Sequence, residues 1–147
     1  MTDALLEASK ALVGIALRTM PTNPDVTVTQ FRALVLLEGE PGMRAADLAQ
    51  ALAVSPSTAT RLCDRLVRNG LVVREASTQD RREVCLSLTA SGLTAVRDGL
   101  TRRRRALSRL VEQIPDEDRA SFVRSLLAFG GAAATDKEPA WALGWRS

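Results

Sequence analysis

The strongest constraint on the fold lies in residues 45–70, AADLAQALAVSPSTATRLCDRLVRNG, where two short helices must follow each other closely. The apolar spacing of residues 45–54 predicts the first of them. Ser55 is a good N-cap for the second, and Pro56 suits its first position, where a missing N–H costs nothing. Gly70 predicts a left-handed stop at its end. The sequence therefore predicts two helices joined by a tight turn.

The second of these helices has two different faces. Ala59, Leu62 and Leu66 recur at i, i+3 and i+7 and predict its buried face. The residues expected to face outward are small and polar or charged, namely Ser57, Thr58, Thr60, Arg61, Asp64, Arg65 and Arg68. Such a pair is typical of a helix-turn-helix, whose second helix enters the major groove of DNA.

A β-hairpin is expected directly after the two helices. Val84, Leu86 and Leu88 alternate with smaller or more polar residues, which predicts a half-buried strand, and residues 71–75 can pair with it. The connecting run STQDRRE, residues 77–83, carries arginine where a tight turn normally prefers Gly or Asn. We interpret this run as the wing of a winged helix.

Further helices are predicted on both sides. One covers about residues 2–20, and another starts at Thr27, an N-cap with Gln30 as its capping-box partner and Val26 and Phe31 as a hydrophobic staple. A long helix capped by Thr89 is expected to reach about Ile114, with Leu93, Leu100 and Leu107 repeating every seven residues. A last helix presents Phe122, Val123, Leu126 and Leu127. Helices at both chain ends have apolar faces that a central lobe cannot cover, which predicts a homodimer.

The fold class that follows is mainly α with a small β-hairpin wing. Of the chain's residues 46% are apolar, and the long apolar side chains are mostly Leu and Val at helical spacing. A length of 147 residues suits one core. The expected divisions are a helical dimerisation region (1–22 and 90–130), a winged helix-turn-helix lobe (26–89), and a tail (131–147) that is either docked or disordered.

Several function classes lack their usual residues. The chain has no histidine, no Gly-rich phosphate loop and no nucleophile elbow, so we expect no catalytic residue, cofactor or enzymatic activity. Cys63 and Cys85 are far apart and form no CxxC pair, which argues against a metal site or disulfide framework. Each is read as a small buried hydrophobe, with redox sensing by Cys63 as the alternative. No apolar run could span a bilayer and the N-terminus is acidic, so we expect a cytoplasmic protein without membrane contact.

Positive charge is concentrated around the helix-turn-helix. From Ser55 to Arg82 the chain has six arginines and three acids, an excess of +3 that equals the net charge of the whole chain. Arginine suits forked hydrogen bonds to phosphate or guanine.

Three motifs in this order resemble the MarR family of bacterial transcriptional regulators over residues 1 to about 130. They are VTVTQFRAL, DLAQALAVSPSTATRLCDRLVRNGLVVRE, and DRREVCLSLTASG, which holds a D-x-R wing at Asp80 and Arg82 and an L-T-x-x-G junction at Leu88, Thr89 and Gly92. The resemblance implies a homodimer that grips a pseudo-palindromic operator on double-stranded DNA. Members usually repress transcription, and many release DNA when a small phenolic or anionic effector binds.

These considerations assign roles to individual residues. Major-groove contacts are expected from Ser57, Thr58, Thr60 and Arg61, and phosphate contacts from Ser55, Arg65 and Arg68. In the wing, Arg81 and Arg82 are expected at the minor groove, and Asp80 is expected to brace Arg82 or the loop. The competing interpretation is a solvated surface, in which Asp64 pairs with Arg68 and the wing arginines only solvate a turn.

The run RRRR, residues 102–105, is interpreted as a solvated helix face with interhelical ion pairs. Arg103 differs because it falls on the apolar stripe of its helix. It pairs either with an acid such as Asp3 or Glu7 across the dimer or with an anionic effector, since buried charges need partners.

Two other functions fit the same residues: an architectural DNA-binding protein with no effector response, and a helical protein-interaction module whose wing contacts a protein.

Overall fold

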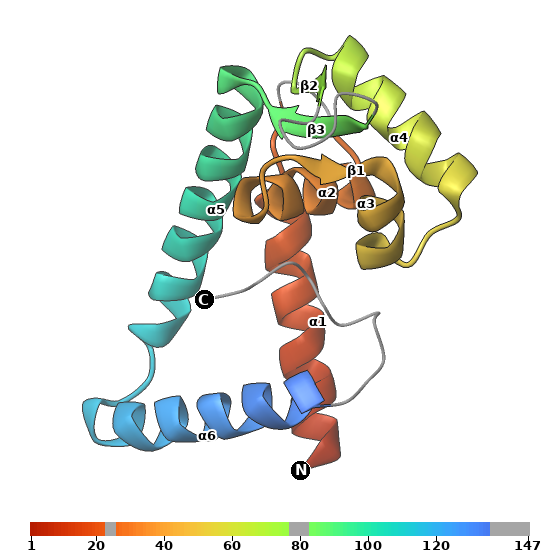
Figure 1. Ribbon diagram of the computed structural model, residues 1–147. Helices are drawn as coiled ribbons and strands as arrows, with labels where there is room; N and C mark the ends of the chain where they lie inside the picture. Colours follow the sequence, from red (N-terminus) through yellow and green to blue (C-terminus); the bar gives the residue numbers. More distant parts are fainter. Residues whose placement is uncertain (23–25, 77–82, 136–147) are drawn as a thin grey trace. The chain divides into compact units, whose positions relative to one another are not determined.

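The computed structural model describes residues 1–22, 26–76 and 83–135, and the chain divides into two compact units. In the described part of the chain, one unit is Pro21–Arg97, and the other combines Met1–Met20 with residues 98–135. The described chain is mainly α with one small antiparallel sheet, which confirms the predicted fold class (Figure 1). None of its helices has the length and apolarity that a bilayer-spanning segment needs.

The predicted helix-turn-helix is present as α3 (Ala45–Leu52) and α4 (Pro56–Arg68), which pack against each other. At the start of α4 the Ser55 hydroxyl accepts a hydrogen bond from the Thr58 N–H at 3.2 Å. The turn contains Ala53 in the left-handed region at φ 54°, and Gly70 ends the second helix at φ 69°. The predicted inner face of α4 is buried together with Cys63, namely Ala59, Leu62 and Leu66.

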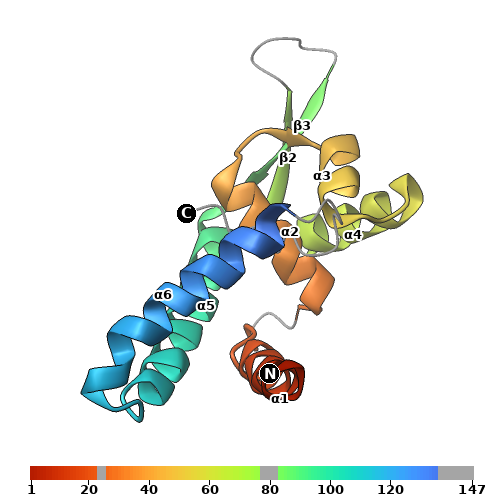
Figure 2. The ribbon, with the colours of Figure 1, turned by 90° about the horizontal axis from the view of Figure 1, so that it is seen from below.

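The sheet has three strands, in the order β1 (Met43–Arg44), β3 (Val84–Leu88), β2 (Val72–Ala76). The predicted hairpin is confirmed, with β2 and β3 antiparallel and adjacent in Figure 2. The sequence did not predict β1, because two residues carry no periodic signal. Val84 was expected on the buried face and is 55% exposed, because it is the outermost residue of β3, beyond the core that covers Leu86.

The core of this unit lies between the sheet and α2 (Val28–Gly39), which contacts both β3 and α3. The predicted capping box is confirmed: Thr27 N–H donates to Gln30 Oε1 at 2.8 Å, and Gln30 N–H donates to Thr27 Oγ1 at 3.2 Å. Val26 and Phe31, the predicted staple residues, are both buried.

A compact junction connects the helix-turn-helix, the hairpin and α5 (Ala90–Val111). The Thr89 N–H donates to Leu71 O at 3.0 Å, and the Thr89 hydroxyl donates to Gly70 O at 2.6 Å while accepting from the Gly92 N–H at 3.0 Å. Thr89 therefore caps α5, as predicted, and holds the two ends of the hairpin together. A Cβ on Gly92 would lie 2.1 Å from Leu71 O, so no other residue fits here without movement.

The second unit contains α1 (Thr2–Arg18), the later part of α5, and α6 (Asp116–Thr135). Its arginines cap helix ends, where carbonyl groups lack partners. Arg102 donates to Met20 O at 3.2 Å, and Arg119 donates to Glu112 O at 3.3 Å and to Ile114 O at 3.1 Å. The helix boundaries differ from the predicted ones: α5 ends at Val111, before Ile114, and α6 continues to Thr135, beyond residue 130.

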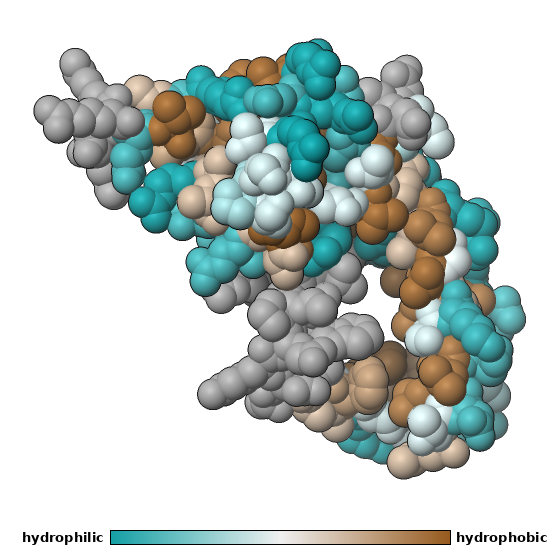
Figure 3. Space-filling model, turned by 90° about the vertical axis from the view of Figure 1, so that its right-hand side faces the viewer, coloured by the Kyte–Doolittle hydropathy of each residue, from teal (hydrophilic) through white to brown (hydrophobic). Residues whose placement is uncertain are grey.

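This unit leaves much apolar surface in solvent, visible as hydrophobic side chains in the lower half of Figure 3. The exposed apolar residues of α1 are Leu5, Leu6, Leu12, Val13 and Leu17, and those of α6 are Phe122, Val123, Leu126, Leu127 and Phe129. An accumulation of exposed apolar side chains on two helices is characteristic of interaction sites.

Gly92→Ala tests the junction. The new methyl group would meet the Leu71 carbonyl, so the free energy of unfolding should fall by about 1–3 kcal/mol, as for other overpacked sites. The control is Gly39→Ala at the end of α2, where a Cβ meets nothing within 4 Å, and it should leave stability unchanged or slightly raised. Equal stability of the two variants in urea unfolding would contradict this account.

Candidate nucleic-acid interface

The exposed face of α4 collects most of the residues predicted to contact DNA. Ser57, Thr60, Arg61, Arg65 and Arg68 are exposed, and Thr58 is half-buried. They share one face because the opposite side of the helix is committed to the core through Leu62 and Leu66. The structure therefore presents two hydroxyls and three guanidinium groups along one helix.

Hydrogen bonds within the helix limit what its hydroxyl groups can offer. The Ser55 hydroxyl donates to Thr58 Oγ1 at 2.9 Å, and the Thr60 hydroxyl donates to Pro56 O at 2.9 Å. Each hydroxyl has one proton. In this conformation Ser55 and Thr60 can accept a hydrogen bond from a base or water, whereas donation to a phosphate requires the proton to turn away from its present acceptor.

The acidic residue on α4 does not neutralise the arginines of that helix, because it pairs with an arginine of the hairpin. The competing interpretation paired Asp64 with Arg68, but the Asp64 carboxylate pairs with Arg74 of β2, with Oδ1 and Nη2 2.5 Å apart. Arg68 instead donates from Nε to the backbone oxygen of Asp64 at 3.4 Å. Within the described ranges, Arg61 and Arg65 have no acidic partner. The ion pair also joins α4 to the base of the hairpin.

The wing residues Asp80, Arg81 and Arg82 lie outside the described residues. The strands on either side of them, β2 and β3, pair with each other, and Arg44 of β1 anchors the return strand. Its guanidinium binds Asp47 at 2.7 and 3.0 Å and Glu83 at 3.1 Å. This arrangement lowers the pKa of Asp47 and raises that of Arg44. Nothing in the sequence pattern pointed to Arg44.

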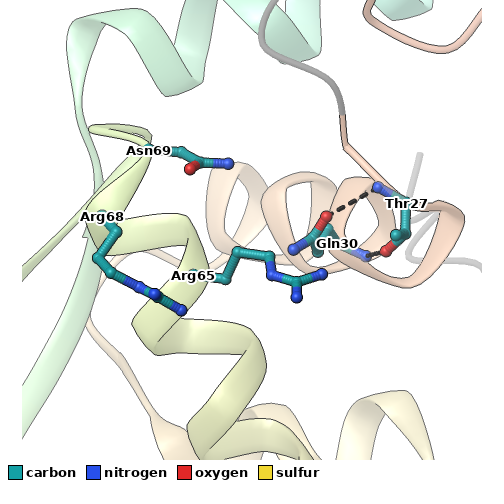
Figure 4. Close-up of a pocket in the computed structure, with 5 residues that line it drawn as sticks. All are labelled: Thr27, Gln30, Arg65, Arg68 and Asn69. Carbon is teal, nitrogen blue, oxygen red and sulfur yellow. Dashed lines mark hydrogen bonds between the residues drawn. The ribbon is translucent and has the colours of Figure 1, made fainter.

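A pocket of about 300 Å³ opens between the end of α4 and the start of α2. It is lined by Thr27, Gln30, Arg65, Arg68 and Asn69 (Figure 4). Of these, only the two arginines were predicted to contact a ligand. Gln30 was recognised only as a helix cap, because its position beside α4 depends on tertiary packing.

The other candidate chemistry is weak. Cys63 is 1% exposed, and burial raises the pKa of its thiol, so the reactive thiolate is disfavoured. No cluster of potential metal ligands occurs among residues 1–22, 26–76 and 83–135.

Arg103, the arginine on the apolar stripe of α5, contacts the end of α1. It donates to Ala16 O at 3.3 Å and to Thr19 Oγ1 at 3.4 Å, and burial lowers its pKa. Thr19 in turn donates to Ile15 O at 2.8 Å. The Arg103 side chain thus caps the end of α1 of its own chain.

Comparison with known proteins agrees with this architecture. Residues 26–84 match the model of the MarR family. The structure of RV1404 from Mycobacterium tuberculosis is 38% identical and superposes with a TM-score of 0.83 over 93% of this chain and 92% of that chain. Among curated proteins of Bacillus subtilis, the HTH-type transcriptional regulator YsmB is 32% identical over 69% of this chain and 70% of its own. The HTH-type transcriptional repressor MdtR is 28% identical over 77% and 73%.

The winged helix-turn-helix, the exposed basic face of α4 and these similarities lead to one conclusion. The chain belongs to the MarR family of DNA-binding transcriptional regulators.

Proposed function

We propose that this protein is a homodimeric, sequence-specific repressor that binds a pseudo-palindromic operator in the cytoplasm. The observation that carries the proposal is the exposed face of α4, on which Arg61 and Arg65 have no acidic partner within the described ranges. In a helix-turn-helix this face lies in the major groove. The hairpin then extends toward an adjacent minor groove, where the negative potential favours arginine.

The residues of α4 divide by their position along the helix. Ser57, Thr58, Thr60 and Arg61 occupy its first two turns, which reach base edges in this motif. Arg61 is the proposed reader of guanine, since its fork can bond both acceptors of that base. Arg65 and Arg68 lie in the last turns and contact backbone phosphates, together with Ser55 at the helix start.

Dimerisation explains the apolar surface of the helical unit. The exposed side chains on α1 and α6 include Leu17, Phe122 and Leu127, and burying them against a second copy removes this surface from water. A two-fold dimer also presents two recognition helices, which matches a pseudo-palindromic site.

A small effector is proposed to release the operator. Arg103 is the cationic group for an aromatic or anionic ligand, because its half-buried guanidinium strengthens interaction with an anion. Titrating the operator complex with aromatic acids, and repeating this with Arg103→Met, tests the idea. Equal release from both proteins would show that Arg103 does not bind the effector. If no acid releases the operator, the protein is a repressor that does not respond to such effectors.

Arg61→Ala should relax sequence preference at one base-pair position of each half-site. We expect a loss of discrimination of about 1–3 kcal/mol at that position, measured on operator variants selected from a random duplex library. Arg65→Ala is the comparison, because loss of a phosphate contact should weaken binding to all sequences alike and reduce the salt dependence. A uniform loss for Arg61→Ala would make it a phosphate contact, and an absence of any preferred sequence in the wild type would indicate an architectural protein.

Arg82→Ala should weaken operator binding without changing the dimer, because the wing is remote in sequence from α1 and α6. Anisotropy measures the affinity, and sedimentation measures the association state. Arg124→Ala on α6 removes the same charge outside the DNA-binding lobe and should not weaken binding comparably. Equal affinities of Arg82→Ala and wild type would defeat the wing contact, and a monomeric wild type would defeat the dimer.

A further inference from the structure

Among the described residues, the Nε2 amide of Gln30 has no hydrogen-bond partner at the pocket between α2 and α4. The residue is 4% exposed, and its Oε1 is fixed by the N–H of Thr27, which can only donate. This assignment leaves the Nε2 amide turned toward the pocket, as Figure 4 shows. No hydrogen bond to Nε2 exists in the described part of the chain. Buried amides normally bond both ends, so this N–H group is available to an acceptor that enters the pocket.

The remaining lining supplies positive charge. Arg65 extends from α4 toward Gln30, and Arg68 and Asn69 belong to the end of the same helix (Figure 4). Among the described residues, none of those that line the pocket is acidic. The pocket therefore combines two guanidinium groups with amide donors, which suits an anion that accepts several hydrogen bonds.

We propose that this pocket binds one phosphate-like anion, held by Gln30 Nε2 and the guanidinium groups of Arg65 and Arg68. The start of α2 lies at the same place, and the positive end of the helix dipole favours negative charge. The proposal adds Gln30 and the start of α2 to the ligand-binding surface, whereas the sequence indicated only the arginines.

The anion has two possible sources, a backbone phosphate of bound DNA and a free phosphate. DNA is the first candidate, and this part of the proposal rests on the proposed function. Arg61, Arg65 and Arg68 follow at i, i+4 and i+7 along α4, so the surface that faces DNA continues directly into the pocket. A duplex that lies along α4 then places one strand of its backbone at this end.

Gln30→Glu tests the site without removing the helix cap. Glutamate also serves as the third residue of a capping box, so its carboxylate can still accept from the Thr27 N–H. The second oxygen replaces the free donor and places a negative charge beside Arg65 and Arg68. We expect operator affinity to fall roughly 10- to 100-fold, the range for one hydrogen bond to a charged group, with a smaller salt slope.

Gln113→Glu is the matched control. It makes the same chemical change and the same change in net charge, just beyond the end of α5 and outside the DNA-binding lobe. Its operator affinity should stay within about twofold of wild type, because a change in net charge alone has little effect on binding. Thermal unfolding of both variants checks that Gln30→Glu still folds.

Two readouts distinguish the sources of the anion. If it is a DNA phosphate, ethylation of one phosphate per half-site weakens the wild type but has no further effect on Gln30→Glu. If the anion is a free phosphate, inorganic phosphate at constant ionic strength gives a saturable shift of the Gln30 side-chain NH₂ signal in NMR. The DNA affinity of Gln30→Glu then equals that of Gln113→Glu.

The proposal is overturned if Gln30→Glu binds the operator like Gln113→Glu and phosphate produces no saturable shift. A wild type that binds no DNA contradicts the proposed function instead. In that case the NMR titration alone decides whether the anion site exists.

Discussion

The interactions of Thr89 at the junction hold the DNA-binding lobe together. Its hydroxyl bonds to Gly70 where α4 has ended and to Gly92 where α5 begins, while its N–H bonds to Leu71. These contacts connect segments that are about twenty residues apart in the chain, so the two ends of the hairpin and two helices meet at one point. The direction of the hairpin relative to α4 depends on this closure. Gly92 is necessary because the backbone of α5 must approach the Leu71 carbonyl closely.

In the DNA-binding lobe, the charged residues that join structural elements differ from those that are exposed on α4. Asp64 and Arg74 join α4 to β2, and Arg44 joins the start of α3 to the return strand through Asp47 and Glu83. These pairs are partly exposed and contribute little to stability individually. Their larger effect is to occupy nearby acids, so that Arg61 and Arg65 face solvent without an acidic partner in the described part of the chain.

Local chemistry accounts for the parts of the fold that could be predicted. The capping box of Thr27 and Gln30, the Ser55 cap and the Gly70 stop each involve a few neighbouring residues, and each is confirmed. The features that could not be predicted are contacts between distant segments. Strand β1 exists only because β3 offers it a partner, and Asp64 pairs with Arg74 because β2 of the hairpin packs against α4.

By itself the sequence determined the order of helices and strands, the buried face of α4 and the concentration of arginine around it, because periodicity and capping act over one or two helical turns. Only the tertiary structure decided which of these groups remain available to a ligand. Gln30 illustrates the difference: its role as a cap follows from its spacing from Thr27, whereas its free amide beside Arg65 results from the packing of α2 near the end of α4. Such proximity depends on how the core packs, and no local pattern encodes it.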